Sequence, residues 1–382
     1  MGHDRVSLAF IGAGAVNFGG GEGPWDHASR FERIAGVRCV GAADVDEARA
    51  RAALAARQSG DCGGVWSEAR AFGDWRQMVE AVRPDAVVVG LPPAAHGRPA
   101  PPDDVEMALA RKGIAMLVEK PLGLASPAEA QKVADELARS GALVSVGYMF
   151  RYAAAVAAMR DVLAETPGGL RVLLARYDCA YSQIVKADCW DRRRSGGPIV
   201  EQATHFVDLA RYLGGEVELD SVRAAEIPAG GPVGRLADMP RGPSGQPLDA
   251  DVPPEHRIPR ATVAHWRFAG GALGALAHGV LLHGQRYHAE LEVWGDGVRC
   301  ILADPYGDCR LGIRRGGSEQ TEWRTFDDDP YMAEDVAFIE AVRTGSARSI
   351  RSTYGDALRT HGLTWRITAC ASGGQHAVGG EA

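Results

Sequence analysis

The first third of the chain alternates apolar runs with segments of helical composition. The apolar runs lie at residues 5–14, 37–44, 85–92 and 114–118, and the helical segments lie at 47–58, 74–82, 103–113 and 126–141. Runs that stay apolar throughout are typical of parallel strands that helices cover on both faces. The pattern therefore predicts an α/β fold that begins with a doubly wound parallel sheet.

The helical segment that follows the fourth apolar run carries its own boundary signals. Ser126 suits the N-cap, Glu129 completes a capping box, and Gly141 ends the helix. We place the division between two domains just before this helix. The first domain is expected at residues 1–125 and the second at residues 126–382.

The second half of the chain has longer strand-like runs and less helix. These runs lie at residues 170–181, 261–268, 272–282, 288–295 and 298–304. Because little helix separates the later ones, they predict an α+β domain with a large, mostly antiparallel, open sheet. One helix is expected at 200–215, and the Pro- and Gly-rich stretch 228–259 predicts a long irregular surface loop.

Composition narrows the class of protein. The 382 residues carry a formal net charge of −7 and no long basic run, which argues against a nucleic-acid partner. No window approaches the roughly 18 apolar residues of a membrane helix, and the N-terminus lacks a signal-peptide cleavage pattern. The seven cysteines are scattered without a CxxC pair, so we expect reduced thiols, no metal site and a cytoplasmic protein.

A glycine turn follows the first apolar run. Gly12 permits a tight bend and Gly14 lets the backbone approach a pyrophosphate, although Asn17 replaces the third glycine of the GxGxxG pattern. Asp44 ends the second apolar run, where a carboxylate accepts hydrogen bonds from the adenosine ribose and repels a 2′-phosphate. With no arginine evident nearby, we expect a Rossmann domain that binds NAD rather than NADP.

Lys120 stands directly after the fourth apolar run, in the sequence Glu-Lys-Pro. One interpretation is a solvated loop lysine. The other is chemical, because residues at the carboxyl ends of parallel strands face the ligand crevice, where a lysine can donate or accept a proton.

Taken in order, these motifs resemble those of the glucose–fructose oxidoreductase / inositol dehydrogenase / MocA family. The shared segments are the glycine turn at 12–14, Asp44, LPPAAH at 91–96, EKP at 119–121, GYMFRY at 147–152 and SGGPIVEQATHFVDLARYLGG at 195–215. The resemblance spans nearly the whole chain. It implies a nicotinamide-dependent enzyme that acts on sugars, cyclitols or related polyols and forms homodimers or homotetramers through the open sheet.

The resemblance also implies the catalytic residues. The family lysine maps onto Lys120 and the family histidine onto His205. The acid four residues before the histidine is usually aspartate in the family and is Glu201 here, so the charge is kept and one methylene is added. Residues four apart share a face of a helix, and we therefore expect Glu201 and His205 to project together. Asp208 fits a structural hydrogen bond better.

Further binding residues complete the predicted site. The cofactor-binding candidates are Gly12, Gly14, Ala15, Asp44, Pro92, His96, Glu119 and Lys120, with Glu119 beside the nicotinamide, and the substrate-binding candidates are Arg151, Trp190, Arg192, Arg193 and Arg194. For His96 the alternative is a surface turn, and for Arg151 it is a salt bridge between domains. The three arginines are either a solvated loop or a clamp for an anionic sugar, because guanidinium groups bind carboxylate, phosphate or sulfonate through paired hydrogen bonds.

Three functions use these residues. The first is an NAD-dependent oxidoreductase acting on a sugar, sugar acid or cyclitol. The second is an NAD-dependent glycosidase, similar to the sulfoquinovosidases of the family, which oxidises C3 transiently, eliminates the aglycone and then reduces the product again. The third is a non-catalytic sensor of sugar and NAD, against which the presence of Lys120, Glu201 and His205 argues.

Overall fold

A computed structural model describes residues 5–20 and 26–373 of the chain. The described chain forms two compact units, each built from two segments. The first comprises Met1–Tyr152 and Asp329–Leu358, and the second comprises Ala153–Asp328 and Arg359–Ala382. This division differs from the boundary expected after residue 125, because the helix and strand that follow that position complete the first unit.

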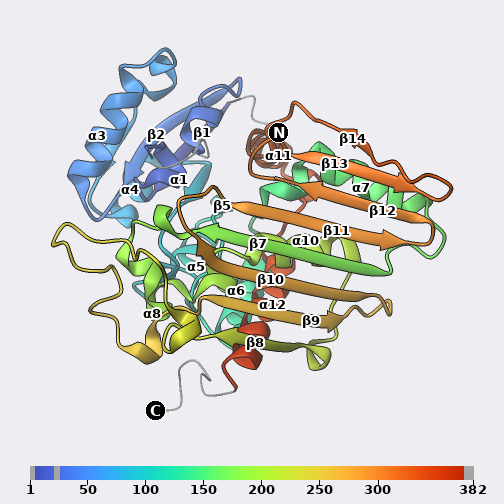
Figure 1. The fold of residues 1–382 in the computed structure, drawn as a ribbon. Coiled ribbons are helices and arrows are strands. Elements are labelled where there is room, and N and C mark those ends of the chain that lie inside the picture. The colour runs from blue at the N-terminus through green and yellow to red at the C-terminus, as the bar shows by residue number, and fades with distance from the viewer. Residues whose placement is uncertain (1–4, 21–25, 374–382) are drawn as a thin grey trace. The chain divides into compact units, whose positions relative to one another are not determined.

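The first unit contains a six-stranded sheet in the order β3-β2-β1-β4-β5-β6, in which every pair is parallel (Figure 1). Its strands are β1 (Val6–Ile11), β2 (Val37–Ala43), β3 (Arg70–Phe72), β4 (Ala86–Val89), β5 (Ala115–Val118) and β6 (Val144–Val146). The helices are α1 (Ala15–Phe18), α2 (Ala28–Phe31), α3 (Glu47–Gln58), α4 (Trp75–Val82), α5 (Val105–Ala110), α6 (Pro127–Ser140) and α11 (Pro330–Thr344). This strand order is that of the Rossmann fold, so the predicted doubly wound sheet is confirmed.

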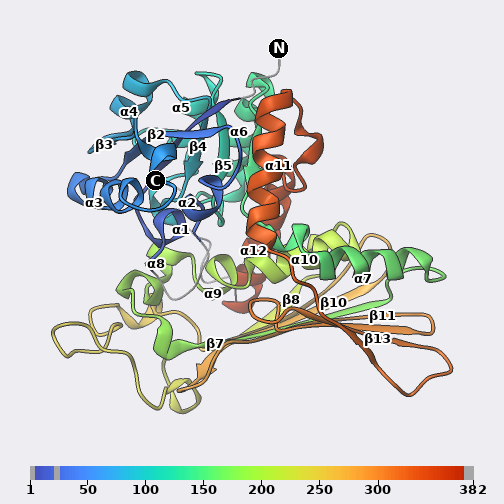
Figure 2. The same ribbon diagram turned by 90° about the horizontal axis from the view of Figure 1, so that it is seen from above.

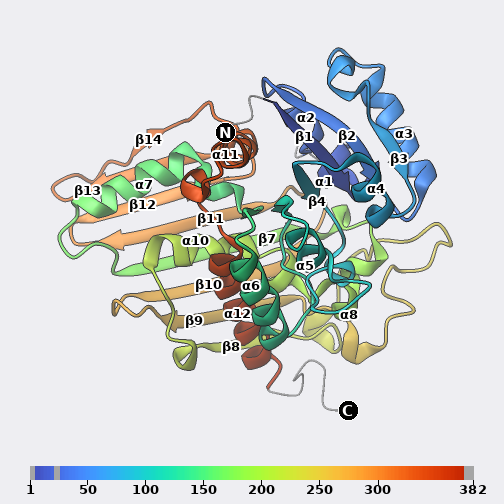
Figure 3. The ribbon, with the colours of Figure 1, turned by 180° about the vertical axis from the view of Figure 1, so that it is seen from behind.

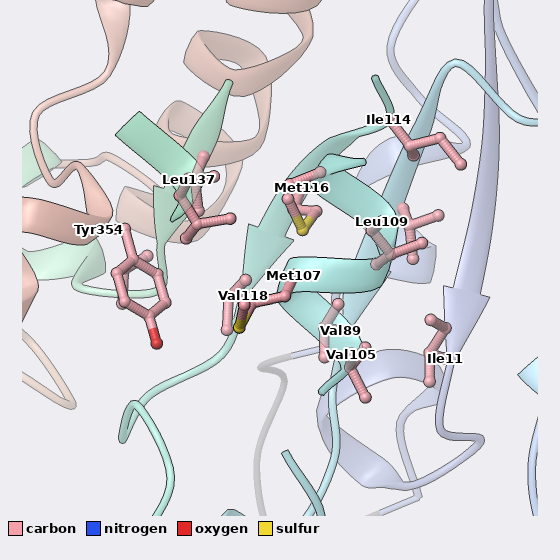
Figure 4. Close-up of a cluster of buried hydrophobic side chains, with 14 of the residues drawn as sticks. Ile11, Val89, Val105, Met107, Leu109, Ile114, Met116, Val118, Leu137 and Tyr354 are labelled. Atoms are coloured by element: carbon pink, nitrogen blue, oxygen red, sulfur yellow. The ribbon is translucent and has the colours of Figure 1, made fainter. Parts of the chain in front are cut away.

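The central strands are apolar on both faces because each face supports its own core. On one face, Val89 and Val118 pack with Leu109 of α5 and Leu137 of α6 (Figure 4). The capping box predicted at the start of α6 is confirmed, since the Ser126 side chain accepts a hydrogen bond from the N–H of Glu129. Because the strands are parallel, their carboxyl ends lie at one edge of the sheet, where the candidate residues of this unit lie.

The second unit contains an eight-stranded sheet in the order β14-β13-β12-β11-β7-β10-β9-β8. Its strands are β7 (Val172–Ala180), β8 (Arg223–Ile227), β9 (Ala261–Arg267), β10 (Leu273–Leu282), β11 (His288–Gly295), β12 (Val298–Ala303), β13 (Arg310–Arg315) and β14 (Glu322–Arg324). All neighbouring pairs are antiparallel except β7 and β10. The predicted open, mostly antiparallel sheet is therefore confirmed.

Helices of this unit lie on one face of the large sheet. Figures 2 and 3 show α7 (Ala154–Glu165) and α10 (Thr204–Gly214) on the same side of the strands. Exposed apolar side chains lie on the opposite face, among them Val263, Leu273 and Trp294. Residues 228–259 form two short 3₁₀ turns and two isolated bridges, one between Arg241 and Pro247 and one between Arg257 and Asp191, as expected for an irregular loop.

The single helix predicted at 200–215 is wrong. The chain forms α9 (Pro198–Glu201) and then α10, and the two are separated by a turn at Gln202 and Ala203. The N–H of Ala203 donates to the carbonyl of Pro198, five residues earlier, and this wider turn interrupts the α-helical ladder. Glu201 therefore ends one helix and His205 begins the next, so the spacing of an ideal helix does not relate their side chains.

Among the described residues, no helix is both long enough and apolar enough to cross a membrane. The longest, α12 (Tyr354–Ala371), is amphipathic. It begins within the first compact unit and continues into the second.

Candidate active site

The glycine turn after β1 is tightly constrained at its first glycine and open at its second. Gly12 has φ +90°, and a Cβ there would lie 2.4 Å from the carbonyl oxygen of Gly90 on the neighbouring strand connection. At Gly14, apart from the glycine and its two neighbours in sequence, no atom of the described chain lies within 4 Å of the position a Cβ would occupy. The turn thus leaves backbone exposed to open space, as a pyrophosphate requires. Ala15 begins α1 directly after it.

Asn17 explains the departure from the usual glycine pattern. Its buried amide Nδ2 donates to the carbonyls of Ile11 (3.1 Å) and Gly12 (2.7 Å). A Cβ at Gly90 would lie 2.6 Å from this amide, so Gly90 supplies the close approach between the turn and the next strand. The sequence did not predict that Gly90 would take the place of the third glycine of the pattern, because Gly90 lies far from the turn along the chain.

Asp44 lies at the end of β2 and faces the same turn. Its Oδ2 accepts from the N–H of Ala13 (2.8 Å), and its Oδ1 accepts from the N–H of Asp46 (2.9 Å). The expectation that no arginine lies near it is wrong, because Arg49 Nη1 lies 3.6 Å from Oδ2. Arg49 stands on the first turn of α3, which brings it back towards the strand end.

The turn after β4 holds His96 in the interior. Pro92 precedes a short 3₁₀ turn, and His96 follows that turn with 1% of its surface exposed. Its Nδ1 lies 2.6 Å from Glu106 Oε1, while Glu106 Oε2 accepts from the N–H of Gly97. His96 is therefore anchored by a buried carboxylate of α5, and the alternative of a surface histidine is wrong.

Glu119 and Lys120 directly follow β5, and the two side chains have different surroundings. The carboxylate of Glu119 is buried, and its Oε1 lies 2.9 Å from His27 Nε2 while its Oε2 accepts from the backbone N–H of Lys120 (3.2 Å). His27 in turn contacts Asp335 of α11. Lys120 is only partly buried. The Glu119 carboxylate therefore contacts His27 and the backbone of Lys120 within the protein. The sequence did not predict the contact with His27, because His27 lies 92 residues away along the chain.

The second unit places His205 at the start of α10, beside aromatic side chains of the large sheet. The ring of Tyr306 meets the His205 ring edge-on, with centroids 6.2 Å apart. Asp208, one turn later, accepts from the hydroxyl of Thr360 (2.9 Å), which accepts from Arg211. The structural role expected for Asp208 is therefore confirmed, since it ties α10 to α12.

Tyr177 lies at the centre of this aromatic cluster. Ring centroids of His278, Phe206, Tyr306 and Tyr287 lie 5.1, 5.5, 5.7 and 5.9 Å from its own. Burial, followed by the neighbouring tyrosines, raises the pKa of Tyr177 well above its usual range. The cluster is thus neutral at physiological pH. The sequence predicted a strand at 170–181, but no sequence signal singled out Tyr177 or grouped it with side chains of β10 and α10.

Burial also controls the thiol next to this cluster. It raises the pKa of Cys179 to about 12, and the negative charge of Glu201 adds to the effect. The thiol therefore stays protonated. Glu201 is the carboxylate that faces the tyrosines and Cys179 from the end of α9.

Two predicted substrate residues are occupied elsewhere. Trp190 is fully buried, donates from Nε1 to the carbonyl of Ile184 (3.0 Å), and packs in a small core. Arg151 is also buried, where it donates to the carbonyl of Arg351 (2.7 Å) and pairs with Asp356 inside the first unit. Neither presents a free surface to a ligand in this structure, and the salt bridge of Arg151 lies within one unit rather than between domains.

The three arginines lie on α8 (Arg192–Ser195), and each has a carboxylate nearby. Arg192 pairs with Glu226 at 3.2 Å and Arg193 with Asp191 at 2.6 Å, while Arg194 lies 3.9 Å from Asp188. The hydrogen bond from Arg193 lowers the pKa of Asp191, although burial opposes it. The positive charges are therefore balanced locally.

A parallel sheet in Rossmann order, a glycine turn with open space and an acid at the end of β2 define a dinucleotide-binding oxidoreductase. A family model described as "Oxidoreductase family, NAD-binding Rossmann fold" matches residues 6–148, and a model of an oxidoreductase C-terminal domain matches residues 151–298. The chain belongs to the glucose–fructose oxidoreductase / inositol dehydrogenase / MocA family, whose Rossmann domain binds NAD.

Individual relatives agree with this assignment. An uncharacterized protein of Schizosaccharomyces pombe is 34% identical over 94% of this chain and 96% of its own length. Inositol 2-dehydrogenase 4 of Saccharopolyspora erythraea is 28% identical over 61% of this chain and 62% of its own. The structure of a levoglucosan dehydrogenase with NADH and levoglucosan has a TM-score of 0.73 at 18% identity, covering 97% and 98% of the two chains, which shows the shared fold.

Proposed function

We propose that the protein is an NAD-dependent dehydrogenase or reductase of a neutral sugar or cyclitol. The observation that carries the proposal is the arrangement at one edge of the parallel sheet. The open backbone at Gly14, the carboxylate of Asp44 and the partly buried Lys120 all follow the carboxyl ends of its strands. Ligands of doubly wound sheets bind at this edge.

The side chains present suit hydride transfer at a carbinol carbon. NAD, when bound beside Gly14 and Asp44, would supply the hydride acceptor or donor. Lys120 supplies an ammonium that polarises the substrate oxygen and stabilises a developing alkoxide. From the resemblance to the family, we assign removal of the hydroxyl proton to His205 as general base.

The charge balance around α8 supports a neutral substrate. Arg192 and Arg193 are paired with Glu226 and Asp191, so binding an anion there would require breaking ion pairs that already exist. The sequence relatives named as inositol and levoglucosan dehydrogenases also act on uncharged compounds. The anionic clamp gains no support from this geometry.

A second copy of the chain suits the face of the large sheet that carries no helix of its own unit. Val263, Leu273 and Trp294 are 57%, 49% and 42% exposed on that face. Exposed apolar residues gathered on one sheet face are typical of interfaces between subunits. We therefore propose a homo-oligomer that forms through this sheet.

The decisive experiment is to screen purified enzyme and NAD against neutral sugars, cyclitols and acidic sugars, following NADH formation. We expect reduction of NAD with at least one neutral polyol and a lower kcat/KM for acidic analogues. A parallel assay uses nitrophenyl glycosides. Release of nitrophenolate without net NADH would identify a glycosidase instead, and a lack of turnover with every compound in both assays would contradict an enzymatic function of this class.

A further inference from the structure

His27 lies between two buried carboxylates of the first unit. Its Nε2 is 2.9 Å from Glu119 Oε1, and its Nδ1 is 2.8 Å from Asp335 Oδ1. The exposed fractions of His27, Glu119 and Asp335 are 1%, 7% and 0%. A neutral imidazole carries one N–H and can donate to only one of two acceptors. Two ionised carboxylates at these distances therefore require a second proton on the ring.

The surrounding charges favour placing that proton on His27. Burial alone would lower the pKa of His27, but Asp335 and then Glu119 outweigh it and raise the pKa well above its ordinary value. Burial raises the pKa of Asp335, and the positive charge of Arg30 partly opposes this rise. Arg30 is itself paired with Asp329 at 2.8 Å, and the ring of Phe31 forms an apolar wall with its centroid 6.0 Å from that of His27.

The opposite side of Glu119 is equally constrained. Its Oε2 accepts from the backbone N–H of Lys120 at 3.2 Å, and a Cβ at Gly147 would lie 2.6 Å from its Oε1. The imidazole and the N–H thus hold the carboxylate in place. The backbone directly after β6 can approach it because Gly147 has no side chain. In the described chain, no group of three or more histidines, cysteines or acids is arranged to hold a metal ion.

We propose that His27, kept as an imidazolium by Asp335, is a positioning residue that fixes Glu119 and thereby the backbone from which Lys120 projects. The chain of contacts runs from α11 through α2 to the end of β5. Without the positive charge, Glu119 would be a buried carboxylate without a cationic partner in this chain of contacts and would turn towards water. The proposal rests on the proposed function only for the role of Lys120, since the charge state of His27 does not depend on it.

The charge state is measured directly in the enzyme without added cofactor. Protein labelled with ¹⁵N and ¹³C in histidine is titrated by NMR, and His27→Gln assigns the resonance. We expect both ring nitrogens of His27 to be protonated at pH 7, with a midpoint well above the ordinary value of about 6.5. Asp335→Asn should lower that midpoint by about one unit or more, and Glu334→Gln, the matched change at the adjacent buried acid of α11, should leave it in place. A neutral His27 at pH 7 in the wild type, or an unchanged midpoint in Asp335→Asn, would overturn the proposal.

Kinetics then test the positioning role. His27→Gln and Asp335→Asn should each lower kcat by roughly tenfold, while the Kd for NADH measured by fluorescence changes by less than about threefold, because the geometry at Lys120 is disturbed and the binding turn is not. Glu334→Gln should retain wild-type kcat. Wild-type kcat in Asp335→Asn would refute the positioning role. If the sugar screen fails while the NMR result holds, the proposed function is wrong and the imidazolium bridge stands.

Discussion

Two buried histidines, one in each compact unit, have opposite surroundings. His27 and His278 are 1% and 2% exposed. His27 has a carboxylate at each ring nitrogen, whereas His278 lies edge-on to Tyr177, and its Nε2 has no hydrogen-bond partner among the described residues. Accordingly, carboxylates raise the pKa of His27, and burial lowers the pKa of His278 to about 3.

The comparison teaches that burial does not determine whether a histidine is charged. The region around His27 holds charge in the interior because each charge has a partner, and Lys120 is attached to that region. The region around His278 excludes charge and presents aromatic rings. We interpret the first region as one that holds paired charges in the interior and the second as one that remains neutral. Substitutions in each region test this interpretation.

The largest effect is expected from Lys120→Ala. Removing the ammonium should lower kcat by about 100-fold or more, because an electrostatic and proton-transfer group is lost, while the Kd for NADH stays within about threefold. Steady-state kinetics and fluorescence titration measure the two quantities. Lys112→Ala, which removes a surface lysine paired with Glu80, is the control and should have wild-type kcat. Normal turnover in Lys120→Ala would mean that the charged region serves stability alone.

His278→Phe tests the neutral region. The pKa of His278 is lower in the folded state than the roughly 6.5 of an unfolded chain, so its contribution to stability is present above pH 6.5 and is lost as the pH falls towards about 3. Between pH 7 and 5 this loss amounts to about 2 kcal/mol. His278→Phe should not show this loss of stability when denaturant unfolding is measured at pH 7 and at pH 5. His265→Phe, at an exposed position of β9, should keep the wild-type loss. An equal loss in both variants would show that His278 is accessible to protons in the folded state.

Asp44 and Arg49 form a smaller charged pair at the cofactor edge. We expect NADH to bind at least about tenfold more tightly than NADPH, since the carboxylate would face a 2′-phosphate. Asp44→Ser should reduce the difference to about threefold or less, because Arg49 would then keep only Asp46, at 3.9 Å, as a partner and would accept the phosphate. Titration calorimetry with both cofactors measures this. If the preference is unchanged in Asp44→Ser, another residue sets the selectivity.

The smallest effect concerns alkaline stability. The folded-state pKa of His27 is raised, so its contribution is fully present below about pH 6.5 and is lost as the pH rises towards the raised value. Burial also raises the pKa of Asp335. The contribution of Asp335 to stability is therefore lost as the pH rises from its ordinary pKa of 3.8, which begins at lower pH than the loss from His27. The wild type should lose stability between pH 7 and 8, and Asp335→Asn should lose less. Denaturant unfolding at the two pH values measures it, with Glu334→Gln as the control. Identical losses in wild type and Asp335→Asn would argue against a charged His27.

Local patterns predicted the fold well where one physical cause dominated. Continuous apolar runs identified the parallel strands, and the Ser126 capping signals located α6 to the residue. The helix at 200–215 was overextended because composition does not reveal the wide turn at Ala203. Arg49 was missed because α3 folds back towards the strand that precedes it.

The site was predictable only where a motif lies within one segment. Gly12, Gly14, Asp44 and Lys120 each follow a strand and could be found by position. His27 and Asp335 could not, because 308 residues separate them and only the fold makes them neighbours. The same reason hid the grouping of Tyr177 with Tyr287 and Tyr306, which come from different strands and loops of the second unit.

The two-segment composition of the first unit has a consequence for biosynthesis. The partner of His27 lies on α11, and β6 is bridged by Thr353, so this unit lacks essential pieces until residues 329–358 have left the ribosome. By then the polypeptide of the second unit up to Asp328 has already been made. The amino-terminal sheet therefore cannot complete its contacts around His27 until most of the chain has been translated. A chain that terminates before residue 329 would contain Glu119 and His27 but lack Asp335. We expect cellular proteases to degrade such fragments readily.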